Sequence, residues 1–406
     1  RPQGAVVPLD GEFISGVMRG AFHPKDGQLY TVGLDGWGDY STKDGCFQRV
    51  RYLGGKVHKP IGFKVHENGM RIDFTVELEA TQLKDTVNFF AQQWNYRPEA
   101  PIQTSPIFHW PPNPLNIIRW FSARWFVFGE NLIIVGLAFL AWKYFQPSLE
   151  QTISLELGWT LKIFIRNIIL ISVVAGCLHL SLHMRRTQGD RLKFDQRDMT
   201  KSSRMFTFGN QVRDNMFWTL TSGVFFWSAF EILMFWAMAN GYAPVLGWLD
   251  NPIWSIALLF LTPLWISFHF YWVHRLLHWP PIYRIAHSLH HRNTNVGPWS
   301  GLSMHPIEHL LFFSSILIHW VIAAHPIHIL FHMQHQALTA VTSHAGFDAL
   351  LVKDKNALSL GNFHHQMHHR YFECNYGNLE VPWDKMFGSF HDGTDESHAL
   401  FLNRKN

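Results

Sequence analysis

The sequence predicts a mainly α-helical, polytopic membrane protein with a small β-rich module at its N-terminus. Mean hydropathy over the 406 residues is close to zero, but this average conceals two different regions. Residues 1–105 are polar and rich in Gly, whereas residues 115–345 contain long apolar runs rich in Trp and Phe. Several of these runs approach the roughly 20 residues that a helix needs to cross a bilayer. In addition, seventeen of the 26 histidines lie between Tyr271 and Arg370.

Residues 1–100 predict the β-rich module. Short alternating runs such as Gln28–Val32 and Arg71–Val76 are separated by turn signals, among them Lys25-Asp26-Gly27 and Asn68-Gly69. The segments RGAFHPKDGQLYTVGLDGWG and GCFQRVRY resemble the C-terminal part of sorbosone-dehydrogenase-like β-propeller proteins. Because a propeller needs several four-stranded blades, this resemblance implies a fragment of such a domain, and we expect it to have no catalytic role. A Pro-rich linker, residues 101–115, follows.

Residues 116–406 are predicted to form the membrane domain. Four apolar runs are predicted to span the bilayer: Phe121–Phe145, Trp159–His179, Met216–Met238 and Ile253–Val273. Two further apolar runs, His309–Ala323 and Ile327–Val341, are too short to span it and are broken at Pro326. They predict a re-entrant hairpin or two tilted helices.

The distribution of basic residues predicts the orientation of these spans. Residues 184–215 carry eight Lys and Arg, whereas residues 146–158 and 240–251 carry none. Since cytoplasmic loops are enriched in Lys and Arg, residues 184–215, 274–305 and 344–406 are expected at the cytoplasmic face. The net charge of +4 is too small to indicate a nucleic-acid partner. The three cysteines, Cys46, Cys177 and Cys374, have no paired spacing, which argues against a disulfide framework or a Cys-type zinc site.

Three spaced histidine clusters carry the functional prediction. They read His-x-x-x-His, His-x-x-His-His and again His-x-x-His-His, and His344 between the last two is a further candidate. Neutral imidazole is a common ligand of iron, zinc and copper, and helical spacing of three and four residues places such side chains on one face. Eight or nine imidazoles are more than one ion needs, so we predict a two-metal site. The candidate ligands are His274, His278, His287, His290, His291, His344, His365, His368 and His369.

The sequences HRLLH, HSLHH and HQMHH resemble the hallmark of the fatty acid hydroxylase and sterol desaturase superfamily, over about residues 215–395. The segments SGLSMHPIEH, NYGN and WDKMFGSF belong to the same resemblance. It implies that the clustered histidines are metal ligands and that His344 matches a further ligand position. His305 and His364 are weaker candidates. The resemblance also implies two iron ions, O2 as co-substrate, and an electron donor such as a ferredoxin or a cytochrome b5 with its reductase.

The predicted function is that of an O2-dependent, membrane-bound di-iron oxidase. It would hydroxylate or desaturate an unactivated C–H bond of a sterol or fatty acyl lipid drawn from the bilayer, and zinc is expected to compete for the same imidazoles in purified samples. Carboxylates should fix the imidazole tautomers, and the candidates are Glu308, Asp348, Glu373 and Asp384. The alternative is a His-rich membrane metal-binding or transport protein. Transport sites lie near the bilayer midplane, whereas these clusters follow the spans.

Overall fold

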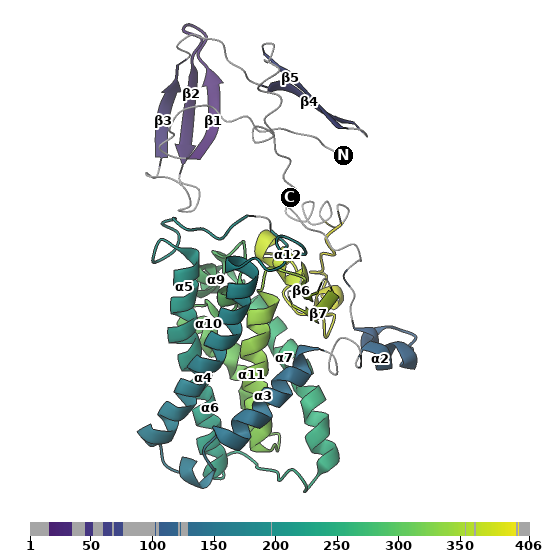
Figure 1. Cartoon of the computed structure of the whole chain (residues 1–406). Coiled ribbons are helices and arrows are strands. Elements are labelled where there is room, and N and C mark those ends of the chain that lie inside the picture. The colour runs from purple at the N-terminus through teal and green to yellow at the C-terminus, as the bar shows by residue number, and fades with distance from the viewer. Residues whose placement is uncertain are drawn as a thin grey trace. The chain divides into compact units, whose positions relative to one another are not determined.

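The computed structural model of this chain describes residues 16–34, 45–51, 60–66, 69–75, 102, 105–120, 122, 129–195, 197–353, 355–360, 363–394 and 397. The chain separates into two compact units. The first comprises Arg1–Gln93 with Ser203–Met205, and the second comprises Trp94–Ser202 with Phe206–Asn406. Figure 1 shows the strands of the first unit and the helices of the second.

The first unit is a small β module. Strands β1 (Gly16–Phe22), β2 (Leu29–Leu34) and β3 (Gly45–Val50) form an antiparallel meander, and β4 (Pro60–His66) pairs with β5 (Gly69–Phe74). The turn between β1 and β2 uses Gly27 at a φ of 66°, a conformation that favours glycine. These strands confirm the predicted β-rich character, although Asn68 and Val76 lie outside the described residues. The resemblance to sorbosone-dehydrogenase-like proteins stays a prediction.

Three helical segments of the second unit are long and apolar enough to cross a membrane: Leu157–Met184, Gln211–Ala239 and Pro252–Leu277. They contain α4 (Leu157–Leu178), α5 (Gln211–Trp218), α6 (Val224–Ala239) and α7 (Pro252–Leu277). Three of the predicted spans are thereby confirmed as candidates. In the most apolar window of the first and third segments, only 28% and 33% of the residues are buried. The remaining residues of these windows are not buried within the chain.

A buried ion pair joins α4 to α6 inside these apolar segments. Arg166 of α4 contacts the carboxylate of Glu231, and Asn167 Nδ2 lies 3.2 Å from Glu231 Oε2. The side chains of Arg166 and Glu231 are almost completely buried. Because an unpaired charge is costly in hydrocarbon, this pairing explains how the α6 segment tolerates a carboxylate.

The predicted span Phe121–Phe145 is described only in part. Helix α3 (Glu130–Tyr144) has 15 residues and is therefore about 22 Å long, shorter than the ~30 Å apolar core of a bilayer. Helix α2 (Pro114–Trp120) precedes it, and residues 121 and 123–128 lie outside the described residues. A fourth span accordingly stays a prediction.

Helix α11 (Pro326–Ser343) is the central element of the helical unit. Sixteen of its 18 residues are buried, and it packs against α3, α4, α6 and α7 (Figure 1). Helix α10 (Pro306–Phe313) and the 3-10 helix η9 (Ser314–Trp320) form the preceding arm. The break at Pro326 is the start of α11, where proline fits because its missing N–H has no partner to lose.

The histidine-bearing segments gather at one end of this bundle. After α7 the chain forms α8 (Pro280–Ile282), η7 (Tyr283–His287), α9 (Ser288–His291) and η8 (Pro298–Leu302). Beyond α11 come the hairpin β6 (Ala349–Val352) and β7 (Lys355–Ser359), then α12 (Phe363–Tyr371) and α13 (Trp383–Met386). Segment Leu157–Met184 ends, and Gln211–Ala239 begins, on the side where α7 ends (Figure 1). Which side of a membrane this is stays a prediction.

Candidate metal centre

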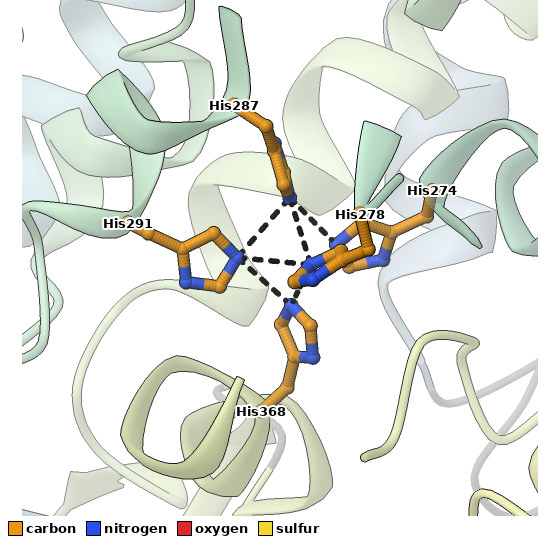
Figure 2. A group of neighbouring side chains, drawn as sticks. All are labelled: His274, His278, His287, His291 and His368. Atoms are coloured by element: carbon orange, nitrogen blue, oxygen red, sulfur yellow. Dashed lines mark hydrogen bonds between the residues drawn. The ribbon is translucent and has the colours of Figure 1, made fainter. Parts of the chain in front are cut away.

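Five histidine side chains from α7 and its C-cap, η7, α9 and α12 converge on one point. They are His274, His278, His287, His291 and His368. Figure 2 shows their rings directed toward one another. The nitrogens that meet are all Nε2, and six pairs of them lie 3.1–3.2 Å apart. Four of the five side chains are buried and the fifth, His278, is half-buried. We call these five residues group one.

Four further histidines form a second point of convergence, group two. They are His290, His344, His365 and His369, all buried. Their Nε2 atoms lie 3.0–3.3 Å apart along the contacts that join His344 to the other three and His369 to His365. The nine candidate ligands of the sequence thus lie in two groups of facing nitrogens.

The two short helices α9 and α12 each supply both groups. The α9 region places His287 and His291, four residues apart, in group one and His290 in group two. Helix α12 does the reverse, since His365 and His369 enter group two and His368 enters group one. Residues four apart share a helix face, whereas the residue between them in each cluster is rotated away from it. The His-x-x-His-His spacing therefore serves two neighbouring sites from one turn of helix.

In four of the rings, a backbone carbonyl at the outer nitrogen fixes which nitrogen carries the proton. Nδ1 of His274 lies 2.6 Å from the Tyr376 carbonyl, and Nδ1 of His368 lies 2.6 Å from the Cys374 carbonyl. In group two, Nδ1 of His344 lies 2.8 Å from the Ala340 carbonyl, and Nδ1 of His290 lies 3.3 Å from the Ser303 carbonyl. A carbonyl oxygen only accepts, so Nδ1 is the donor in these rings. In the neutral form their Nε2 atoms then carry lone pairs and no proton.

The arrangement of lone pairs fits a bound cation. Burial, reinforced by neighbouring imidazoles, holds the pKa of His287, His291 and His368 well below the ordinary 6.5, so these rings are neutral near pH 7. Two Nε2 atoms without protons cannot hydrogen-bond to each other, yet they lie about 3 Å apart. Metal–nitrogen bonds of about 2.1 Å at right angles would separate adjacent ligand nitrogens by about 3.0 Å. The donor set of each group is therefore suited to one metal ion.

Two of the predicted carboxylates support this shell of imidazoles. Glu308 Oε1 lies 2.8 Å from Nδ1 of His287, and burial raises the pKa of Glu308 well above its ordinary value. A cation beyond the ring would favour the ionised carboxylate instead. Asp384 accepts hydrogen bonds from the backbone N–H groups of Tyr376 and Gly377, both at 2.8 Å. It thereby holds the turn whose carbonyl orients His274.

The other predicted residues lie outside the two groups. His305 is the N-cap of α10, where its Nδ1 accepts from the Ile307 N–H at 3.2 Å. His364 is buried, with Nε2 3.5 Å from Asp384 Oδ2. Asp348 lines the cavity beside the groups, and Glu373 is exposed in the turn after α12. Neither His305 nor His364 has a nitrogen in either group.

The two carbonyls that orient His274 and His368 come from a turn that the sequence analysis did not assign. Phe372 and Asn375 both have positive φ, at 65° and 55°. Asn375 is fixed there because its Nδ2 donates to the carbonyls of His364 and His391. The sequence signal was the Asn- and Gly-containing stretch directly after the third cluster, because Asn tolerates this conformation better than most residues.

A cavity of about 470 Å³ opens onto both groups. It reaches His274 and His287 of group one and His290, His344 and His365 of group two. Much of the wall between the helices is apolar and comes from α7, α10 and the segment before α10, through Ile266, Phe270, Val273, Leu277, Met304 and Phe312. This lining is suited to a hydrocarbon chain or ring system, which would lie against the nitrogens.

Replacing Glu308 with Gln should weaken metal binding in group one by about tenfold, because partners of ligand imidazoles tune metal affinity. The amide keeps an oxygen that can accept from His287 Nδ1 but removes the negative charge. Glu373→Gln is the matched control, since that side chain is exposed. Competitive titration of the purified chain with Co²⁺ measures the effect. Equal affinities for both variants and the parent chain would show that Glu308 plays no part in metal binding.

The chain is similar to known proteins over part of its length. Residues 259–389 match the fatty acid hydroxylase family model. The chain is 30% identical over 145 residues to the Delta(7)-sterol 5(6)-desaturase of Eremothecium gossypii, covering 36% of this chain and 39% of that protein. It is 31% identical over 130 residues to the corresponding Saccharomyces cerevisiae desaturase, covering 31% and 33%. It is 29% identical over 147 residues to the lathosterol oxidase of Mus musculus, covering 36% and 47%.

The chain thus spans less than half the length of each of these relatives. No solved structure gives a significant match. The region matched by the family model contains all nine histidines of groups one and two. Residues 259–389 thus match the fatty acid hydroxylase family, and the chain is similar over part of its length to sterol desaturases.

Proposed function

We propose that this protein is an integral membrane oxidoreductase that hydroxylates or desaturates an unactivated C–H bond of a lipid with O2. The observation that carries the proposal is the pair of imidazole groups opening onto one largely apolar cavity. The relatives support a lipid substrate, because they are named as sterol desaturases and a lathosterol oxidase. A sterol or a fatty acyl chain fits the apolar lining.

Each group would hold one iron ion. Group one offers five imidazole nitrogens and group two offers four. When bound, the two irons would supply the activation of O2 that oxidation of an unreactive C–H bond requires. Hydroxylation consumes one O2, two electrons and two protons and yields one water. Desaturation consumes the same and yields two waters. The electrons would come from a donor such as a ferredoxin or a cytochrome b5 system.

The residues of this chain bind and position the substrate. Ile266, Phe270 and Phe312 offer apolar contacts and exclude water from the space in front of the imidazoles. Glu308 and the carbonyls of Tyr376 and Cys374 keep the rings in the tautomer that presents Nε2. Because these rings are already oriented, the binding energy of the lipid can serve to position the lipid in front of them.

The histidine-bearing end is proposed to face the cytoplasm. The loop between Met184 and Gln211 lies at this end, and residues 184–215 carry eight Lys and Arg. Basic loops are retained on the cytoplasmic side, where soluble electron donors are available. The lipid would reach the cavity from the bilayer.

Production of the full chain in cells, followed by lipid analysis under ¹⁸O2, tests the proposal. We expect a new lipid product, either carrying one ¹⁸O atom or lacking two hydrogens. A double variant, His290→Ala with His368→Ala, is the control without a complete ligand set in either group. An identical lipid profile for the parent chain and the double variant, in iron-replete cells with an active electron donor, would contradict the oxidase function. Bound metal without any lipid product would favour a metal-binding role.

A further inference from the structure

Two polar side chains of α11 lie in the wall of the cavity deep in the helical bundle. His335 and Gln336 line the cavity from α11, in the same lining as Ile266, Phe270 and Phe312. Their exposed fractions are 5% and 1%. They belong to neither imidazole group. Buried polar side chains in an apolar wall need hydrogen-bond partners, so the partners of these two residues indicate what the cavity accepts.

The side-chain amide of Gln336 is fixed in one orientation. Its Nε2 donates to the Phe312 carbonyl, which can only accept, and its Oε1 lies 2.6 Å from Ser315 Oγ. Ser315 must therefore donate its single proton to Gln336. The 2.8 Å contact between Ser315 Oγ and His332 Nε2 then has His332 as the donor. His319 Nε2, 3.2 Å from His332 Nδ1, donates in turn.

This chain of hydrogen bonds leaves one donor of Gln336 unused. The amide has two N–H groups, and one of them goes to the Phe312 carbonyl. Among the described residues, no hydrogen bond uses the second. Gln336 thus holds a rigid N–H donor in the wall of the cavity, positioned by three buried side chains and one carbonyl.

His335 beside it also lacks a partner. Its Nδ1 is buried and makes no hydrogen bond within the described part of the chain. Phe331 packs against its ring, with centroids 5.7 Å apart. An unsatisfied buried nitrogen destabilises the protein unless a ligand or water completes it. Two neighbouring residues with unsatisfied hydrogen-bonding capacity in one cavity wall make a subsite for a polar group.

We propose that His335 and Gln336 bind a hydroxyl oxygen of the lipid that occupies the cavity. A hydroxyl group can accept the free N–H of Gln336 and can donate to His335 Nδ1, so one oxygen satisfies both residues. A ketone or ether oxygen could only accept. The proposal rests on the proposed function in one respect, that the occupant of the cavity is a lipid.

The position of His335 and Gln336 on α11 also sets how far a bound hydroxyl group lies from the imidazole groups. His335 and Gln336 precede His344 of group two by nine and eight residues. At 1.5 Å per residue, they lie about 12–13.5 Å along the helix axis from this histidine. A hydroxyl held there is several bonds away from any carbon held against the imidazoles. The pair would therefore act as a specificity determinant that selects lipids by the distance between hydroxyl and reacting carbon.

Equilibrium binding of two probes that differ only in a hydroxyl group tests the subsite. The full chain in detergent micelles is titrated with radiolabelled hexadecanol and with hexadecane, and the ratio of the two dissociation constants is compared between variants. We expect His335→Leu and Gln336→Leu each to reduce the preference for the alcohol by about fivefold to tenfold. Met304→Leu, another cavity residue, should leave the ratio unchanged. His335→Asn, which keeps a short polar group, should retain most of the preference.

An unchanged ratio of the two dissociation constants in both Leu variants would overturn the proposal. This includes the case in which the binding of both probes weakens equally, which indicates a structural role. If the Leu variants do not fold, NMR of the parent chain tests the proposal instead. The ¹⁵N resonance of His335 Nδ1 is identified by its loss in His335→Asn. The chemical shift of this resonance should change when hexadecanol is added and should not change when hexadecane is added. An unchanged chemical shift with hexadecanol would also overturn the proposal. These measurements need neither iron nor O2. A chain that prefers the alcohol but oxidises no lipid would contradict the proposed function alone.

Discussion

Replacing His368 with Ala is expected to remove one iron ion per chain and to abolish lipid oxidation, while the protein still folds. His368 contributes its Nε2 to group one, at 3.1–3.2 Å from the Nε2 atoms of His278 and His291. Replacing His290 with Ala should have the same effect on group two, where its Nε2 meets that of His344. We expect a loss of activity of more than about 100-fold, since oxidation requires both ions. Iron per chain and lipid product are measured on the same preparations.

The control for these variants is His305→Ala. His305 was a weaker candidate ligand in the sequence, but in the structure it caps α10. Loss of such a cap costs about 1 kcal/mol of stability and should leave both iron ions in place. Full activity in His290→Ala or His368→Ala would contradict the assignment of these residues as ligands. A loss of iron in His305→Ala would contradict the assignment of His305 as a helix cap.

The second large effect is expected from Gly301→Ala. A Cβ atom at Gly301 would lie 2.2 Å from the carbonyl oxygen of Ala340 and 2.5 Å from its carbon. This is the carbonyl that accepts from Nδ1 of His344. Backbone atoms of a buried helix cannot give way cheaply, so we expect a loss of about 1–3 kcal/mol or more, together with the metal ion of group two. Thermal unfolding and metal content measure both effects.

Gly136→Ala is the matched control for this variant. Gly136 lies within α3, and an added Cβ would meet no atom within 4 Å. Alanine is the better helix former, so stability should be unchanged or rise by about 0.5–1 kcal/mol. A Gly301→Ala protein with the unfolding temperature and metal content of the Gly136→Ala protein would refute the close contact between η8 and α11.

Local patterns predicted those features that depend on chemistry within one segment. The apolar runs located α4, α6 and α7 because the length of an apolar helix is itself the signal. The spacing of the histidines identified the nine residues that the structure gathers, because helical periodicity aims them in common directions. Whether they bind metal is a proposal that the iron measurement tests.

Features that depend on contacts between distant segments were not predictable. The spacing did not show which histidines of other segments His290 and His291 would each meet, because this depends on how α9 lies relative to α11 and α12. The His-Pro pairs at His305 and His325 begin α10 and α11 as helix caps, which is a local signal of a helix start and not of a metal ligand. The partner of Gln336 is a serine 21 residues earlier in the chain, which no periodicity reveals.

The iron content of the full chain tests the central claim most directly. The protein is purified anaerobically from iron-replete cells and examined by metal analysis and Mössbauer spectroscopy. We predict two iron ions per chain, in two distinct nitrogen-rich environments that correspond to the five imidazoles of group one and the four of group two. Fewer than two iron ions per chain would contradict a di-iron centre built from these nine histidines.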